Sequence, residues 1–68
     1  MERFVLVEEP TFTWAVFDEF RDVPAEHDGY VAVGLDKPEA IAFARAANAR
    51  EALARRHRTD ISASPNIP

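Results

Sequence analysis

Apolar and polar residues alternate along two stretches near the start of the chain, a pattern typical of β-strands that bury one face. The first stretch, residues 3–9 (RFVLVEE), is rich in β-branched and aromatic side chains, and the second is residues 12–18 (FTWAVFD). Pro10 ends the first stretch, and the connection is so short that the two stretches are predicted to pair as an antiparallel hairpin. We expect the second strand to direct three side chains towards the core: Phe12, Trp14 and Val16.

A third strand is predicted after a long polar interruption. Residues 19–29 are acidic and contain Pro24 and an Asp28–Gly29 turn signal, so they are expected to form a loop. Residues 30–35 (YVAVGL) resume the alternation, and Gly34 suggests a bulge near the end of this strand. The core-facing side chains of this strand are expected to be Val31, Val33 and Leu35.

A helix start follows directly. Asp36 can cap the first free N–H groups, Glu39 three residues later completes a capping box, and Pro38 lies in the first turn, where its missing N–H costs little. Alanine dominates the next stretch, which favours a helix up to about His57. One stripe should pack on the sheet: Ala40, Ile41, Ala44 and Ala47, with Phe43 at its border. A second stripe lies roughly opposite and either meets another helix or is exposed: Ala42, Ala46, Ala49 and Leu53.

The predicted order is β-β-β-α, and the fold class is α+β. The simplest arrangement is a three-stranded antiparallel sheet with one C-terminal helix packed on one face. Residues 1–58 should form a single compact domain, and residues 59–68 a flexible tail. The other face of the sheet stays open in this fold, where Phe17 and Tyr30 form either an apolar interaction patch or ordinary scattered surface residues.

The size and composition of the chain narrow the function classes. It has 68 residues and no cysteine, which excludes disulfides, thiolate zinc sites and cysteine nucleophiles. A domain this small has a modest core, so we expect it to gain stability from a partner or from a second copy. No secretory signal pattern and no apolar stretch of membrane-spanning length is present in the sequence, so a cytoplasmic protein is expected.

Charge is distributed unevenly around a net value of −4. Residues 1–40 carry ten acidic and three basic residues, a net −7, whereas residues 41–68 carry five arginines and two acids, a net +3. The N-terminal part should therefore repel phosphate, and the helix and its end could attract it.

Catalytic patterns are missing from the sequence. The sequence Glu26-His27-Asp28 places adjacent side chains in different directions, so it is not a catalytic triad. No metal-ligand spacing occurs, and the two glycines form neither a phosphate-binding loop nor a dinucleotide fingerprint. We expect a protein that is not an enzyme and that has no metal and no cofactor.

Two short segments resemble parts of known families. Trp14-Ala15-Val16 and the run from Val33 to Ala40 resemble the passage from sheet to helix in integrase arm-type domains, which place a basic sheet in the DNA major groove. This sheet is acidic instead, so only the topology is implied. Residues 29–32 (GYVA) and 36–40 (DKPEA) are similar to pieces of HicB-type antitoxins. The whole profile, small, acidic and single-domain, resembles phage-encoded inhibitors such as anti-CRISPR proteins.

These observations lead to three competing hypotheses. The first is a phage or mobile-element inhibitor that masks a basic surface of a host nucleic-acid-binding machine. Its partner-binding residues would be Glu8, Glu9, Phe17, Asp18, Glu19, Asp22, Glu26, Asp28 and Tyr30. The second is a nucleic-acid-binding accessory or antitoxin-type protein that uses the arginines of the helix: Arg45, Arg50, Arg55, Arg56 and Arg58. The third is a structural homodimer.

Overall fold

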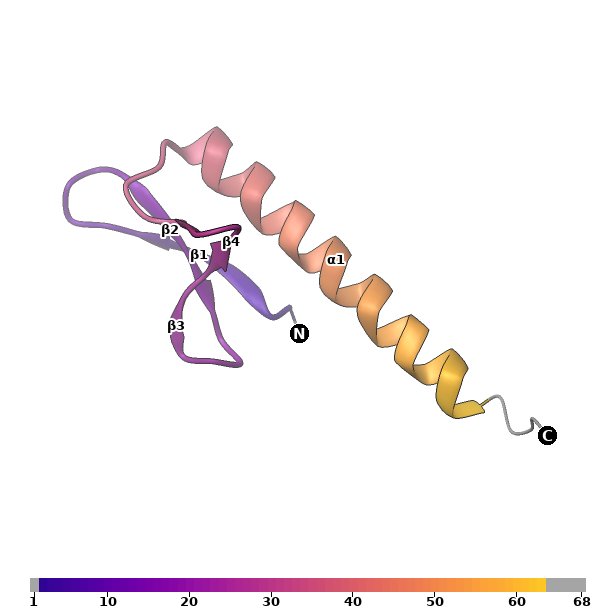
Figure 1. Cartoon of the computed structure of the whole chain (residues 1–68). Coiled ribbons are helices and arrows are strands. Elements are labelled where there is room, and N and C mark those ends of the chain that lie inside the picture. The colour runs from indigo at the N-terminus through magenta and orange to yellow at the C-terminus, as the bar shows by residue number, and fades with distance from the viewer. Residues whose placement is uncertain (1, 64–68) are drawn as a thin grey trace.

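The computed structural model of this chain describes residues 2–63 and confirms the α+β prediction (Figure 1). Three strands form an antiparallel sheet in the order β1-β2-β3: β1 (Phe4–Glu8), β2 (Trp14–Asp18) and β3 (Val23–Pro24). The single helix α1 (Lys37–Ala63) packs on one face of this sheet. Two further short strands, β4 (Glu26–His27) and β5 (Tyr30–Val31), pair separately.

The predicted hairpin of β1 and β2 is confirmed, with Val5 opposite Phe17 and Val7 opposite Ala15. A tight turn joins the two strands, in which the Glu9 carbonyl accepts the Phe12 N–H at 3.1 Å. Pro10 holds the second position of this turn, where its fixed φ is favourable.

Phe12 does not face the helix as predicted. Its φ of 65° lies in the left-handed region that closes the turn, and its side chain is 91% exposed. β2 therefore starts two residues later than the alternation suggested, because the turn needs Phe12.

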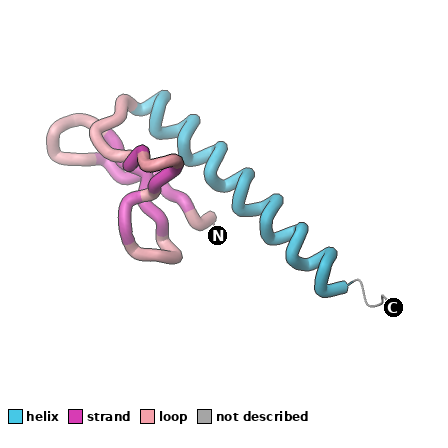
Figure 2. The backbone as a smooth tube through the Cα atoms, viewed as in Figure 1, coloured by secondary structure: helices cyan, strands magenta, loops and turns pink. Residues whose placement is uncertain are grey.

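The third position in the sheet is filled from two separate segments. The Val16 carbonyl accepts the Ala25 N–H at 2.8 Å, and the Val16 N–H donates to the Ala32 carbonyl at 2.9 Å. Trp14 then exchanges two backbone hydrogen bonds with Leu35, at 2.7 and 2.9 Å. The β4–β5 hairpin leaves the sheet between these two segments (Figure 2). The prediction of one continuous strand over residues 30–35, preceded by a loop, was therefore wrong in its boundaries.

The Asp28–Gly29 turn signal is confirmed, with φ values of 53° and 79° that suit a tight hairpin. This hairpin projects from the sheet and carries its strand residues to the surface. Val31 and the following Val33 are 45% and 44% exposed, so the expectation that they face the helix was wrong. Only Leu35 of that predicted set is buried.

The capping box at the start of α1 is confirmed. The Glu39 N–H donates to the Asp36 carboxylate at 2.8 Å, and the Asp36 N–H donates to the Glu39 carboxylate at 3.1 Å. The helix continues to Ala63, beyond the expected end near His57 and through the first part of the predicted tail. Residues 64–68 lie outside the described residues, and the mobility of the tail stays a prediction. At 1.5 Å per residue the helix is about 40 Å long, and its second half extends past the sheet (Figure 1).

The core lies between α1 and β2, and it is small. The predicted helix stripe is confirmed, because Ala40, Ala44 and Ala47 are all buried. Ala40 and Ala44 pack with Val16, the largest of the completely buried side chains among the described residues, and with partly buried aromatic residues at the margin. The opposite stripe is exposed in the structure: Ala42, Ala46, Ala49 and Leu53. A core made mainly of alanine and valine provides little buried apolar area.

Candidate protein-binding surface

The sheet face turned away from α1, named here the outer face, carries apolar side chains. In the observed register, Val5 opposes Phe17 and Val7 opposes Ala15, while Phe17 also opposes Pro24 of β3. These residues point away from Trp14 and Val16, which pack against the helix side. Val7 is 42% exposed, and Phe17 is partly exposed. Of the two residues predicted for the apolar patch, Phe17 therefore lies on the open face, where Val5 and Val7 accompany it.

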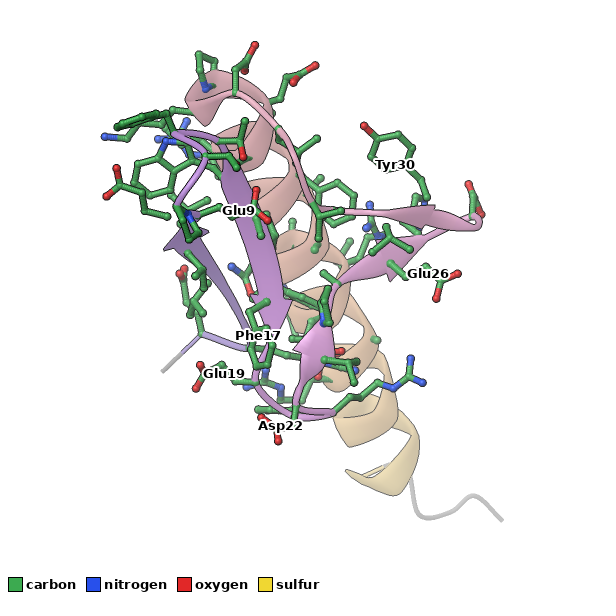
Figure 3. All side chains as sticks on the ribbon, turned by 90° about the vertical axis from the view of Figure 1, so that its left-hand side faces the viewer. Glu9, Phe17, Glu19, Asp22, Glu26 and Tyr30 are labelled. Carbon is green, nitrogen blue, oxygen red and sulfur yellow. The ribbon has the colours of Figure 1, made fainter. Side chains whose placement is uncertain are left out.

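Two acidic residues lie at the end of the outer face nearest Phe17. Glu19 and Asp22 belong to the turn between β2 and β3, named here the acidic turn (residues 19–22), and both are exposed (Figure 3). Backbone hydrogen bonds order this turn: the Glu19 N–H donates to the Arg3 carbonyl at 2.9 Å, and the Asp22 N–H donates to the Asp18 carbonyl at 2.7 Å. Their carboxylates are consequently held on a defined backbone beside an aromatic side chain.

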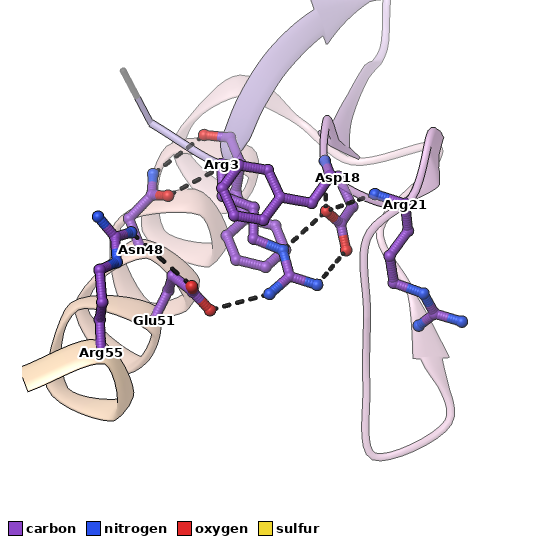
Figure 4. Close-up of polar contacts among 8 residues, drawn as sticks. Arg3, Asp18, Arg21, Asn48, Glu51 and Arg55 are labelled. Carbon is purple, nitrogen blue, oxygen red and sulfur yellow. Dashed lines mark hydrogen bonds and ion pairs between the residues drawn. The ribbon is translucent and has the colours of Figure 1, made fainter. Parts of the chain in front are cut away.

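Asp18 has an internal partner, although the sequence placed it among the partner-binding residues. It is only 4% exposed, and its two oxygens accept hydrogen bonds from the Arg3 guanidinium at 2.8 and 2.9 Å (Figure 4). It also accepts the N–H groups of Phe20 and Arg21, at 3.1 and 3.3 Å. These contacts use the carboxylate to hold the acidic turn, so we leave Asp18 out of the candidate surface.

Electrostatics within this cluster favour the charged forms. The hydrogen bonds from Arg3, helped by the backbone N–H groups, hold the pKa of Asp18 below its usual range despite burial. The same contact, together with Glu51 of α1 at 2.8 Å, raises the pKa of Arg3. Arg3 thus connects the sheet to the helix, and its positive charge is balanced inside the protein.

Glu8 does not belong to the outer face, whereas Glu9 continues the row of Val5 and Val7 at the far end of that face and uses its carboxylate on internal partners. Glu8 opposes Trp14 and is exposed on the helix side of β1. One carboxylate oxygen of Glu9 accepts the Thr13 hydroxyl at 2.7 Å and the Gly34 N–H at 3.0 Å. Gly34 itself has a φ of 67°, in keeping with the predicted irregularity there. Glu9 therefore links the first turn to the segment that leads into α1.

Tyr30 and Phe17 do not share a face, so the expectation that both point away from the helix was wrong. Tyr30 lies on β5, and its ring stacks against Phe43 of α1 with a centroid distance of 6.4 Å. The exposed acids Glu26 and Asp28 belong to the same hairpin. Figure 3 shows Glu26 apart from Phe17 and the acidic turn. The predicted partner-binding residues therefore divide between the outer face and the β4–β5 hairpin.

Two aromatic residues are exposed in turns, of which Phe20 was not considered in the sequence analysis and Phe12 was assigned to the core. Phe20 lies within the acidic turn, is 61% exposed, and has the Arg3 guanidinium 5.1 Å from its ring centroid. The highly exposed Phe12 occupies the turn at the other end of β2. An aromatic residue inside a run of turn-forming acids was the signal available for Phe20.

The helix arginines are separate from this surface. Arg45, Arg50, Arg55 and Arg56 are exposed on α1, and Arg55 lies 3.7 Å from the Glu51 carboxylate. Their spacing distributes them around the helix axis instead of along one stripe. The side chain of Arg58 lies outside the described residues.

Within residues 2–63, no group of three or more potential ligand side chains is arranged to hold a metal ion. In the same part of the chain, no helix combines the length and apolar character needed to cross a bilayer. The chain matches no known family model, no curated protein and no solved structure.

Proposed function

We propose that this chain is a non-enzymatic protein-binding module that covers a basic, nucleic-acid-binding surface of a partner protein and thereby acts as an inhibitor. The observation that carries the proposal is the pairing of an apolar outer face with an ordered acidic turn at its end. Phe17 supplies the aromatic contact, and Glu19 and Asp22 supply the charge.

The apolar part would provide most of the affinity. Desolvated aromatic side chains are the usual energetic centres of protein interfaces, and surrounding polar groups exclude water from them. Phe17, flanked by Val5 and Pro24, fits this role because all three lie on one face of a hydrogen-bonded sheet. A rigid sheet loses little conformational entropy when it binds.

The acidic part would select the partner. The pairing of Arg3 with Asp18 leaves the exposed surface of the β-strand region dominated by carboxylates. Within residues 2–39, which include the strands and the first turn of α1, eight acidic residues are exposed: Glu2, Glu8, Glu19, Asp22, Glu26, Asp28, Asp36 and Glu39. Such a field accelerates association with a basic surface and repels nucleic acid itself. A protein that binds nucleic acid presents such a basic surface, and covering it would displace the phosphate backbone.

The first test is capture of the partner from the cells that encode the chain. The tagged full-length chain is incubated with lysate, the bound proteins are identified, and the purified candidate is tested for loss of nucleic-acid binding when the chain is added. We expect a basic protein whose nucleic-acid complex dissociates as the chain is titrated. A partner that keeps its nucleic acid fully bound would contradict the masking role.

Matched variants separate a specific surface from bulk charge. Glu19→Gln with Asp22→Asn removes two negative charges from the acidic turn, and Ala46→Lys with Ala49→Lys adds two positive charges on the exposed helix stripe. Both double variants change the net charge from −4 to −2. We expect only the first to lose capture, by about tenfold for a loss near 1.4 kcal/mol. Equal capture by both would refute the assignment of the acidic turn.

A further inference from the structure

β1 is an edge strand with a hydrogen-bonding edge that is partly unused. It pairs with β2 alone, and Asn48 of α1 binds its other edge at one point only. The Phe4 N–H donates to the Asn48 side-chain oxygen at 3.0 Å, and the Asn48 side-chain N–H donates to the Phe4 carbonyl at 3.0 Å. Backbone groups alternate along a strand, so the N–H and C=O of Leu6 and Glu8 point to the same edge. No hydrogen bond to these four groups is found within residues 2–63.

A groove lies beside this edge, between β1 and the first half of α1. Its volume is about 350 Å³, and it is mostly apolar, with one acidic residue, Glu2, and one basic residue, Arg45, in its lining. The lining residues that matter here are Phe4, Leu6, Ile41, Ala44, Arg45 and Asn48. An unpaired strand edge with an adjacent groove is the arrangement that accepts an added β-strand.

We propose that the edge of β1 binds β1 of a second copy of this chain, antiparallel and across a two-fold axis. The free part of the edge has two natural limits. Asn48 already occupies the groups of Phe4 on one side, and Pro10 has no N–H to donate on the other. A partner strand must therefore find its hydrogen bonds at Leu6 and Glu8 alone.

Only one two-fold register satisfies those limits. When the axis passes through Val7, Leu6 of each copy lies opposite Glu8 of the other copy. The free N–H and C=O groups of Leu6 and Glu8 in both chains then all form hydrogen bonds. It also places Phe4, whose N–H and C=O are bonded to Asn48, opposite Pro10, which has no N–H. Centring on Leu6 would require the Phe4 groups held by Asn48, and centring on Glu8 would set two carboxylates directly opposite each other.

The side chains agree with the same register. Val7 meets Val7 of the second copy on the outer face, which joins the two apolar faces into one. On the helix side, Glu8 of the second copy comes beside Leu6, which lines the same groove as Arg45. Each interface therefore brings an exposed carboxylate towards an exposed guanidinium, twice by symmetry.

The resulting six-stranded sheet would compensate for the small core of one chain, since short sheets gain stability from added strands. The pairing uses the edge of β1 and not its outer face. The two proposals therefore hold or fail separately, because dimer formation is measured on the pure chain without any partner.

Single cysteines test the register on the full-length chain, which has none of its own. In the proposed register the two Val7 Cα atoms lie about 4.5 Å apart, within disulfide range. Val5 opposes Glu9 of the second copy, so the two Val5 positions are offset by about 13 Å along the strands, beyond any disulfide. Under mild oxidation we expect Val7→Cys to form a covalent dimer and Val5→Cys, on the same face of the same strand, to stay monomeric.

Sedimentation equilibrium of the unmodified chain provides the second readout. We expect a reversible dimer of twice the 7.6 kDa chain mass, at concentrations below about 1 mM. Glu8→Pro removes an edge N–H and should weaken the dimer by about tenfold or more, since each lost 1.4 kcal/mol is a factor of ten. Glu8→Ala keeps that N–H and should retain the dimer. A monomer at every concentration, equal cross-linking of both cysteine variants, or a folded Glu8→Pro variant that dimerises as tightly as the original would each overturn the proposal.

Discussion

Replacing Asp18 with asparagine tests the cluster that holds the acidic turn to the helix. The change keeps the size of the side chain but removes its charge, and its new N–H₂ group faces the Arg3 guanidinium, a second donor. The carboxylate is 6% exposed, and the two Arg3 hydrogen bonds are 2.8 and 2.9 Å long. Breaking this pair should therefore cost more than a surface ion pair does.

The magnitude follows from these contacts. Hydrogen bonds to charged groups contribute about 1.5–3 kcal/mol each, so two bonds give a gross loss of about 3–6 kcal/mol. The asparagine oxygen can still accept one N–H of the turn, and Arg3 keeps Glu51 at 2.8 Å. We therefore expect a net loss of about 2–3 kcal/mol, which lowers Tm by roughly 10–20 °C in a domain of this size.

The assay is thermal unfolding followed by circular dichroism and by Trp14 fluorescence. Asp28→Asn is the matched control, because it makes the same chemical change at a side chain that is 87% exposed. The control should stay within about 0.5 kcal/mol of the original chain. A Tm for Asp18→Asn within the range of the control would refute the reasoning.

The pH dependence gives the same experiment a second check. The pKa of Asp18 is lowered in the folded state, so its stabilising contribution is complete above the unfolded value of about 3.9 and is lost as pH falls through the lower folded value. The asparagine variant lacks this group. The stability difference between the two chains should thus be full at pH 7 and narrow below about pH 4. A difference that stays constant down to about pH 2 would contradict the assigned cause.

Two further substitutions test the contacts that join β1 and the helix start to the rest of the fold. Asn48→Ala removes both hydrogen bonds to the Phe4 backbone at an edge that water can reach. It should lower the free energy of unfolding by about 1–2 kcal/mol in urea titrations. An unchanged midpoint would show that these bonds do not contribute to stability. Asp36→Ala removes half of the capping box and should cost about 1 kcal/mol, whereas Asp36→Asn, which still caps, should cost clearly less; equal losses would contradict the capping role.

Local signals in the sequence predicted the elements whose causes are themselves local. The helix start could be predicted because Asp36 and Glu39 act within one turn, and they form the expected reciprocal bonds. The turn between β4 and β5 could be predicted for the same reason, because Asp28-Gly29 is a local turn signal. Both residues adopt the positive φ that such a turn requires. The buried helix stripe followed from helical spacing alone.

Other features depended on contacts between distant segments. Residues 23–25 and 32–35 share one edge of β2, and the local Asp28–Gly29 signal marks the turn between them without showing that the two segments pair with the same strand. The burial of Asp18 depends on Arg3, fifteen residues away. Charge counting placed Asp18 among the exposed acids because it treats every carboxylate alike, whereas the fold pairs this one and leaves Glu19 and Asp22 exposed.

The affinity of the purified partner for matched variants tests the proposed binding surface most directly. The Kd is measured by titration calorimetry for the original chain, for Glu19→Gln with Asp22→Asn, and for Ala46→Lys with Ala49→Lys. We predict a Kd about tenfold weaker for the acidic-turn variant, equivalent to about 1.4 kcal/mol, and little change for the helix variant. Equal affinities for both variants would show that the partner responds to net charge alone, and would contradict a surface built from Phe17 and the acidic turn.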